Sequence, residues 1–273
     1  VGGVEHAVLH LLYSRFWHHV LHDLGLVSTR EPYKKLFNQG MIQGEDGQKM
    51  SKSRGNVINP DDVIEEYGAD SMRLYEMFMG PLDKSKPWSI KGLQGCARFA
   101  EKIWRIFNDT DKHSEQTDSK ETTRLLHQTI AKVTNDLENM RFNTAISQMM
   151  IFSNHLQGLD TINKETLKTF LLLLNPFIPH IAEELNAQMN AFESLSYTTW
   201  PEFDERLAKE DLVTIAIQVN GKLRGNLQLP LETDDKTIKT EAAKVDRVKK
   251  HLEGKNIVKK VVVPGRLVNF VVK

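Results

Sequence analysis

Residues 49–60 read Lys-Met-Ser-Lys-Ser-Arg-Gly-Asn-Val-Ile-Asn-Pro, the stretch of this 273-residue chain that is most informative about its fold. We call its first part, residues 49–56, the lysine–serine loop. Two lysines, Lys49 and Lys52, lie three residues apart among hydroxyl side chains and before a glycine. Such a loop suits closure over a polyphosphate, where negative charge develops as a phosphate group leaves. The same composition also fits an ordinary basic surface loop, and the spacing of a Walker loop is missing.

Turn and helix signals flank the loop on both sides. Before it, the Asp-Gly pair in residues 44–47 favours a tight turn between two short apolar stretches. After it, Asn59 can cap a helix that begins with proline and carries two aspartates in its first turn, so we expect helices over about 60–67 and 70–79. Upstream, residues 5–21 keep apolar residues at spacings of three and four, which predicts a buried helix.

Four stretches downstream of residue 90 have helical periodicity and predict an antiparallel bundle. They cover residues 92–109, about 121–139, 143–157 and 164–190. Pro176 and Pro179 should kink or split the last of them, because each removes a backbone donor and clashes with the preceding turn.

The end of the chain predicts a small α+β domain with the order ββαββ. Asn220-Gly221 joins the first two β-rich runs and is a strong hairpin signal, and Pro264-Gly265 marks a second turn. The expected elements are strands over 213–219 and 223–229, a helix over 236–252, and strands over 257–263 and 267–272.

We therefore predict a multidomain, mainly α fold. Residues 1–90 form its first part, residues 91–200 the helical bundle, residues 201–211 a linker without periodicity, and residues 212–273 the α+β domain.

The formal net charge is zero, but the charge is distributed unevenly. Residues 212–273 hold 13 Lys and Arg against 6 Asp and Glu, a net of +7, which leaves −7 on the rest of the chain. Lys222 and Arg224 follow the predicted hairpin tip, while Lys249 and Lys250 end the predicted helix, where cations also favour the helix dipole. A segregated basic domain indicates a polyanionic partner, although a lysine-rich helix is often only a solvated face.

Cysteine usage and hydropathy exclude several classes of protein. Cys96 is the only cysteine, which excludes an internal disulfide and a cysteine-based zinc site and suits a reducing compartment. The longest apolar run, 170–174, is far shorter than the ~20 residues of a membrane helix. We expect a cytoplasmic chain without a membrane partner. Its start without methionine also leads us to expect an excised fragment.

Two histidines in the N-terminal segment are candidate site residues. His6 and His10 are four residues apart and fall on one face of the helix predicted there. Two histidines at this spacing can bind zinc, but the sequence offers no cysteine and no nearby third ligand, so we predict no protein-bound metal. A pair of satisfied core histidines explains the spacing better than a metal site does. His18, His19 and His22 are expected at the surface.

The lysine–serine loop resembles a known family. Residues 49–53 spell the signature loop of the class I aminoacyl-tRNA synthetases, and Gly55-Asn56-Val57 with Pro60 continue the pattern. Residues 67–70 with Arg73 also follow as they do in that family. Residues 2–16 resemble the leucine-specific, bacterial-type members more than their isoleucine, valine or methionine relatives.

The resemblance extends along nearly the whole chain. Residues 141–145 and 175–185 resemble the anticodon-binding bundle of these enzymes, where we expect core packing to be the main role of both motifs. Asn186 stands where many relatives have tryptophan, so packing should differ there. Residues 218–225 resemble the C-terminal tRNA-contacting domain of the leucine enzymes.

The resemblance implies an activity and a set of site residues. An intact enzyme of this family activates leucine with ATP and Mg²⁺ to leucyl-adenylate and transfers leucine to the 3′ end of tRNA(Leu), and we expect a monomer. It implies that Lys49 and Lys52 are catalytic and that the ATP-binding segment is Lys49, Met50, Ser51, Lys52 and Ser53. It also places His6 and His10 beside the leucine and adenylate pocket, and makes Lys222, Arg224, Lys249 and Lys250 candidate tRNA contacts.

Several parts that the family carries upstream are missing from this sequence. It has no His-Ile-Gly-His-like element, no nucleotide-binding βαβ half and no editing domain. We therefore expect the isolated chain to be inactive. The alternative is a non-catalytic tRNA-binding module that retains the loop as a relic.

Overall fold

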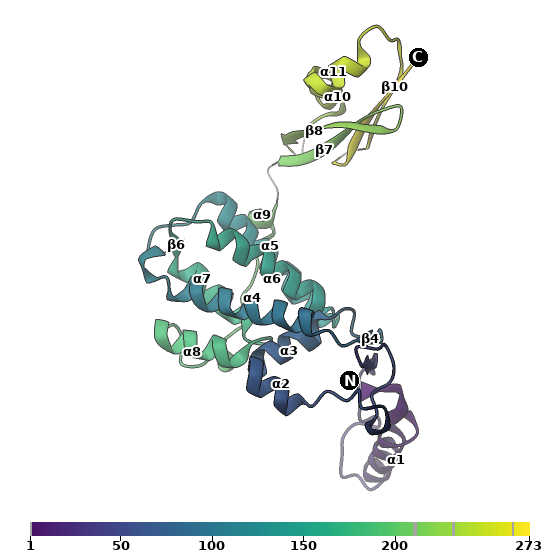
Figure 1. Cartoon of the computed structure of the whole chain (residues 1–273), viewed down its shortest axis with the longest axis vertical. Helices are drawn as coiled ribbons and strands as arrows, with labels where there is room; N and C mark the ends of the chain where they lie inside the picture. Colours follow the sequence, from purple (N-terminus) through teal and green to yellow (C-terminus); the bar gives the residue numbers. More distant parts are fainter. Residues whose placement is uncertain (1, 210–211, 231–232, 264) are drawn as a thin grey trace. The chain divides into compact units, whose positions relative to one another are not determined.

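The computed structural model describes residues 2–209, 212–230, 233–263 and 265–273. The chain divides into two compact units, Val1–Leu207 and Ala208–Lys273 (Figure 1). Each unit has its own apolar core. The division falls inside the predicted linker, residues 201–211, of which residues 210 and 211 lie outside the described part. A short helix, α9 (Glu205–Ala208), occupies the middle of that stretch. None of the described helices is long and apolar enough to cross a membrane.

The first unit begins with short elements that differ from the sequence prediction. They are β1 (Gly2–Gly3), the 3-10 turn η1 (Val4–Ala7), helix α1 (His10–Asp23), and β2 (Asn38–Gln39), which pairs in parallel with β1. The prediction of one buried helix over residues 5–21 is wrong in two respects. The backbone leaves the helical region at Leu9 (φ −107°, ψ −96°), and no residue of η1 or α1 is buried.

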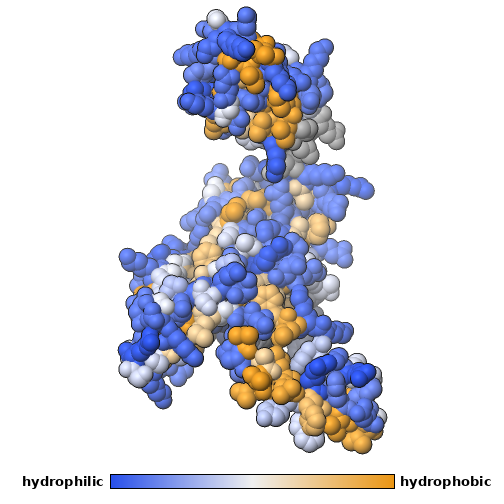
Figure 2. Space-filling model, turned by 90° about the vertical axis from the view of Figure 1, so that its right-hand side faces the viewer, coloured by the Kyte–Doolittle hydropathy of each residue, from blue (hydrophilic) through white to orange (hydrophobic). Residues whose placement is uncertain are grey.

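Helix α1 exposes its apolar side chains. Leu12, Phe16 and Trp17 are 56%, 59% and 61% exposed. Figure 2 shows hydrophobic surface at the lower end of the molecule, where α1 lies. The apolar periodicity did predict a helix, but burial requires a packing partner, and the described residues provide none for this face.

The lysine–serine loop lies between short strands and two helices. β3 (Ile42–Gln43) precedes it and pairs in parallel with β4 (Lys86–Pro87), and the 3-10 turn η2 (Lys52–Arg54) lies within it. Helices α2 (Pro60–Tyr67) and α3 (Ala69–Phe78) follow, close to their predicted ranges. Asn59 caps α2 as predicted, because its side-chain oxygen accepts the backbone N–H of Asp61 at 3.2 Å.

Five helices form the bundle of the first unit. They are α4 (Ile90–Asn108), α5 (Lys120–Glu138), α6 (Phe142–Gln157), α7 (Lys164–Leu174) and α8 (Pro179–Met189). Shorter elements lie between them, namely η3 (Thr110–Lys112), β5 (His113–Ser114) and β6 (Ile162–Asn163), and η4 (Leu195–Tyr197) follows α8. The two prolines split the last predicted helix, since α7 ends before Pro176 and Pro179 is the first residue of α8.

One apolar core joins the bundle to the helices that follow the lysine–serine loop. Phe152 and Phe170 meet edge to face in it, with ring centroids 5.0 Å apart. Leu74 and Tyr75 of α3 are buried in the same core. The loop is therefore carried by a segment that is packed onto the bundle.

The described residues of the second unit form a four-stranded sheet with two helices. Its elements are β7 (Leu212–Val219), β8 (Lys222–Pro230), α10 (Asp235–Lys244), α11 (Asp246–Leu252), β9 (Ile257–Val263) and β10 (Leu267–Val272). The strand order is β8-β7-β10-β9, and only the central pair, β7 and β10, is parallel. The predicted fold class, mainly α with a small α+β part, is confirmed.

The helix predicted over residues 236–252 is two helices. The backbone is extended at Val245 (ψ 120°), between α10 and α11. A Cβ added at Gly225 would lie 3.4 Å from Val248 and 3.5 Å from Val245, so the bend lets the helices lie close against β8. The predicted hairpin turn is present, with positive φ at Asn220 and Gly221. In the other predicted turn, Pro264 lies outside the described residues.

Candidate functional site

One asparagine, Asn56, holds the backbone of the lysine–serine loop in place. Asn56 accepts the backbone N–H of Ser51 at 2.9 Å and donates from its amide to both carboxylate oxygens of Asp46 at 3.2 Å. The backbone N–H of Gln48 also donates to Asp46, at 3.0 Å. The hydrogen bonds from Gln48 and then Asn56 lower the pKa of Asp46, so this carboxylate stays ionised. The loop is thereby fastened to the turn that precedes it.

The two lysines of the loop are available to a ligand. Lys49 and Lys52 are exposed, and neither forms an ion pair within the described part of the chain. Met50, between them, packs its side chain against the apolar core. The arrangement anchors the loop at Met50 and Asn56 and presents two uncompensated ammonium groups, which suits a polyphosphate.

Strand β3, which precedes the lysine–serine loop, is attached to the segment before α4 and, through it, to α3. The N–H of Trp88 donates to the carbonyl of Gln43 at 2.8 Å, and the N–H of Ser89 donates to the hydroxyl of Tyr75 at 2.6 Å. The Tyr75 and Trp88 rings meet edge to face at 4.9 Å. A Cβ at position 92 would lie 2.8 Å from the Tyr75 ring, so only Gly92 permits this approach.

The two candidate histidines do not share one helical face. His6 lies in η1 and His10 is the first residue of α1, with the non-helical Leu9 between them. Both are exposed, and the ring Nε2 of His10 lies 3.3 Å from the hydroxyl of Tyr33. A nearby cleft of about 670 Å³ is lined mainly by residues 3–5, 38–42 and 79–86, and neither histidine lines it.

We predict that the purified chain carries no stoichiometric zinc or iron at these two histidines. The reason is that η1 and α1 supply only two imidazoles, whereas a structural zinc site needs four ligands. Among the described residues, no group of three or more His, Cys, Asp or Glu side chains could hold a metal. Elemental analysis decides the matter: a full metal equivalent that is lost in both His6→Ala and His10→Ala would contradict the prediction.

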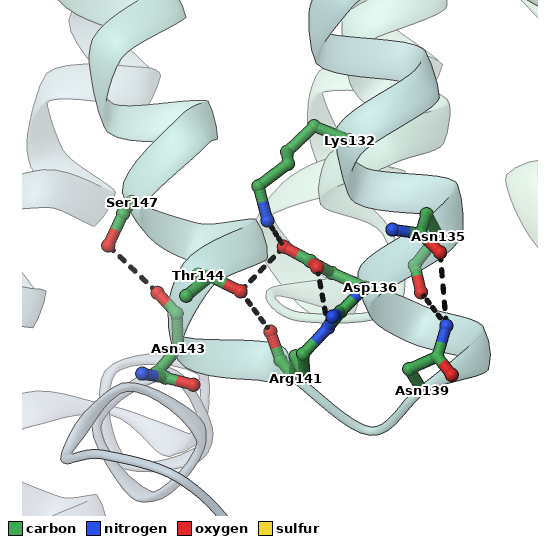
Figure 3. A network of polar contacts seen from close by, with 8 residues as sticks. All are labelled: Lys132, Asn135, Asp136, Asn139, Arg141, Asn143, Thr144 and Ser147. Atoms are coloured by element: carbon green, nitrogen blue, oxygen red, sulfur yellow. Dashed lines mark hydrogen bonds and ion pairs between the residues drawn. The ribbon is translucent and has the colours of Figure 1, made fainter.

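A buried carboxylate that sequence analysis did not predict organises the turn between α5 and α6. Asp136 has no exposed surface, and Figure 3 shows side chains from both helices converging on it. Lys132 forms an ion pair with it, Arg141 Nε lies 3.0 Å from Oδ1, and the hydroxyl of Thr144 donates to Oδ2 at 2.6 Å. The network fixes the turn so that Phe142 packs edge to face on Phe177, with centroids 6.4 Å apart.

The position of Asn186 is filled by hydrogen bonds. This side chain is 2% exposed; its amide donates to the carbonyl of Phe192 at 3.0 Å and its oxygen accepts the N–H of Phe192 at 3.0 Å. A buried asparagine with these partners is well satisfied. It closes the turn after α8.

The candidate cations of the second unit lie on neighbouring elements. Lys222 is exposed at the start of β8, whereas Arg224 is half-buried and its Nε is enclosed without a hydrogen-bond partner among the described residues. A register shift opposite Ile217 and Gln218 leaves Arg224 as the extra residue of a bulge. Lys249 and Lys250 lie in the last turn of α11, as predicted.

Two family models match the chain. One is described as tRNA synthetases class I (I, L, M and V) and matches residues 13–86. The other is described as the anticodon-binding domain of tRNA ligase and matches residues 119–240, so it runs into the second unit. The first match contains the lysine–serine loop, α2, α3 and all of α1 except its first three residues.

Curated relatives match over the whole chain. The leucine–tRNA ligase of Chlorobaculum tepidum is 54% identical to this chain over 277 residues, and that of Chloroherpeton thalassium is 53% identical over 278 residues. Each alignment covers 100% of this chain but only 34% of the relative. The chain thus spans about a third of the length of its relatives. Among solved structures, the ternary LeuRS-tRNA-LeuAMS complex of Agrobacterium radiobacter K84 is similar with a TM-score of 0.79 and 34% identity, covering 100% of this chain and 38% of that one.

Proposed function

Because the chain belongs to the leucine–tRNA ligase family of class I synthetases and spans about a third of its relatives, we propose that it serves in leucine activation and transfer to tRNA(Leu) as part of a longer, monomeric, cytoplasmic enzyme. The observation that carries the proposal is the lysine–serine loop. Its two lysines are exposed without ion pairs, while Met50 and Asn56 hold its backbone in place. A fixed loop with free ammonium groups is suited to act on departing phosphates.

In the proposed reaction a carboxylate oxygen of leucine attacks the α-phosphorus of ATP. The bond from that phosphorus to the bridging oxygen breaks, and pyrophosphate leaves with the electron pair. Lys52, assisted by Lys49, stabilises the charge that grows on the departing phosphates, and Mg²⁺ arrives with ATP as part of the substrate. Ser51 and Ser53 belong to the ATP-binding segment, and their hydroxyls lie 3.2 Å apart.

The exposed apolar segment supports a role within a larger protein. Side chains from Val4 to Leu26 would form an unusually apolar surface if they remained in water. We propose that this segment packs against the remainder of the ligase and that His6 and His10 become polar groups beside the leucine and adenylate pocket there. They would orient the substrate and would not act as general bases.

Leucine-dependent ATP–pyrophosphate exchange tests the function. We expect the purified 273-residue chain to fold but to show no exchange, because phosphate-binding elements of the family are missing from it. The partner experiment uses the Chlorobaculum tepidum ligase in which the matching segment is replaced by this chain; we call it the chimeric ligase. It should exchange leucine-dependently.

Each alternative has its own result. Clear exchange by the purified chain would show that the active-site assignment is wrong. A folded chimeric ligase that binds tRNA but does not exchange would favour the non-catalytic tRNA-binding module.

The basic second unit is proposed to bind the sugar-phosphate backbone of tRNA, at its elbow as the family implies. Phe270 is its only aromatic residue and is fully buried, so the unit lacks the stacking platform with which proteins bind single strands. Its net charge of +7 favours phosphate contacts instead.

Replacing Lys222 and Arg224 together by alanine in the chimeric ligase should raise the KM for tRNA(Leu). The dependence of tRNA affinity on salt should flatten by about one unit of log–log slope per lost phosphate contact. Exposed Lys222 should contribute more than half-buried Arg224. Leucine activation without tRNA should stay nearly unchanged.

The charge-matched control is the double replacement of Lys164 and Lys168, whose ammonium groups each pair with a glutamate at 2.7 Å. If neither double variant changes the salt slope, the basic second unit is only a solvated surface. If both change it equally, Lys222 and Arg224 have no specific role in binding tRNA.

A further inference from the structure

Helix α8 has no cap of its own. Its N-cap residue, Ile178, has no side chain that can accept a hydrogen bond, and Pro179 occupies the first helical position. The N–H groups of His180 and Ile181, in the first turn, therefore need another acceptor, because the first N–H groups of a helix have no partner within it.

Asp70 supplies that acceptor from a distant part of the chain. Its carboxylate accepts the N–H of Ile181 at 2.7 Å and the N–H of His180 at 3.4 Å, and the ring Nδ1 of His180 lies 2.8 Å from the same carboxylate. Asp70 is only 5% exposed. A negative charge at a helix N-terminus is also favoured by the helix dipole, so this contact combines a cap with charge.

The same end of α3 makes a second attachment to this junction. Arg73, one turn after Asp70, donates from Nη2 to the carbonyl of Pro176 at 3.1 Å, just before α8. Two polar side chains of α3 thus hold the α7–α8 junction, which is more than 100 residues away in the sequence.

Helix α3 is also attached to strand β3, which precedes the lysine–serine loop. The loop leads into α2 and α3 along the chain, and Tyr75 reaches back to it through Ser89 and Trp88, whose N–H donates to Gln43. Helix α3 therefore connects the bundle at Asp70 with the loop at Tyr75.

We propose that Asp70 is a positioning residue: by capping α8 it fixes α3, and with it the lysine–serine loop, at one place on the bundle. The consequence for catalysis rests on the proposed function of the loop, whereas the mechanical connection does not. A competing role is local, in which Asp70 only stabilises the first turn of α8.

Hydrogen exchange on the 273-residue chain separates these roles. Asp70→Asn keeps the side-chain volume but removes the charge and one acceptor oxygen. The reporters are the hydrogen-bonded loop amides of Ser51, Arg54 and Gly55. We expect their exchange to accelerate about 3- to 30-fold, the range that corresponds to the loss of a helix cap.

The matched control is Glu183→Gln, in the same helix. Glu183 is also a hydrogen-bonded carboxylate, which accepts from the hydroxyl of Ser194 at 2.8 Å and the N–H of Leu195 at 3.0 Å. Its partners among the described residues are Asn186, within α8, and residues 194–196, after α8, and none of them belongs to α3. This variant should accelerate exchange near residues 186–198 and leave the loop amides unchanged.

The outcomes are distinct. Faster loop exchange in Asp70→Asn but not in Glu183→Gln supports the proposal. Acceleration confined to α8, or equal in both variants, overturns it. If Asp70→Asn does not fold, His180→Ala replaces it. This variant keeps the carboxylate and both backbone donors and loses only the contact of the His180 ring. If His180→Ala then exchanges faster in α8 but at the wild-type rate in the loop, the proposal is overturned.

Kinetics provide the functional readout. In the chimeric ligase, Asp70→Asn should lower the turnover number of ATP–pyrophosphate exchange more than Glu183→Gln does, with the KM for tRNA(Leu) unchanged in both. Equal turnover numbers in the two variants would overturn the catalytic consequence. An unmodified chimeric ligase without exchange would count against the proposed function, and hydrogen exchange would still decide the role of Asp70.

Discussion

Replacing Lys52 by alanine in the chimeric ligase is expected to slow leucyl-adenylate formation about 30- to 1000-fold, a loss of ~2–4 kcal/mol of transition-state stabilisation. Lys52 is exposed and has no ion-pair partner among the described residues, so its charge is available to the phosphates. That charge matters most when pyrophosphate departs, because negative charge is then concentrated on the leaving oxygens. Leucine binding should change far less than the rate of activation.

Pre-steady-state measurement of leucine activation checks this expectation. The control is Lys35→Ala, which removes an exposed lysine outside the lysine–serine loop and should activate leucine at the unmodified rate. Lys49→Ala should fall between the two, since Lys49 is assigned an assisting role. Activation by Lys52→Ala at the unmodified rate would remove Lys52 from the catalytic residues.

The largest effect on stability is expected at Asp136. Asp136→Ala should lower the free energy of unfolding of the first unit by about 2–3 kcal/mol. The loss of a buried ion-pair partner usually costs about 3–5 kcal/mol, because it leaves the other charge buried. Here the side chains of Lys132 and Arg141 are 42% and 50% exposed, so water can solvate both charges after the substitution. The loss of stability then comes mainly from the hydrogen bond of Thr144 and from the geometry of the turn.

Tryptophan fluorescence during urea unfolding measures this effect on one unit. All four tryptophans, Trp17, Trp88, Trp104 and Trp200, lie in the first unit, so the emission does not follow the second. The control is Glu138→Ala, which removes an exposed acid from the same helix end and should change stability by less than about 0.5 kcal/mol. Equal midpoints for Asp136→Ala and Glu138→Ala would show that the network contributes nothing.

The family was predictable from the loop, and the comparisons confirm it. Which residues contact ATP, leucine or tRNA stays a prediction. At two places the structure differs from the geometry on which that prediction was based. Arg224 was expected at an accessible hairpin tip, but a bulge leaves it half-buried. His6 and His10 were placed on one helical face, but the break at Leu9 separates them. Neither the bulge nor the break has a local sequence signal.

The sequence by itself determined the features that depend on a few neighbouring residues. Asn59 and the following proline start α2, the two prolines end α7 and begin α8, and Asn220-Gly221 makes the hairpin turn. In each case a side-chain acceptor or an allowed φ value decides the local conformation, so the pattern can be recognised without the rest of the chain.

Only the tertiary structure decided the features that join distant residues. It buried Asp136 among three side chains, placed Asp70 at the N-terminus of a helix 110 residues further on, and left the apolar face of α1 exposed. Burial and capping across such distances depend on which surfaces meet when the chain folds, and hydrophobic periodicity records that a face needs a partner without recording which partner it is.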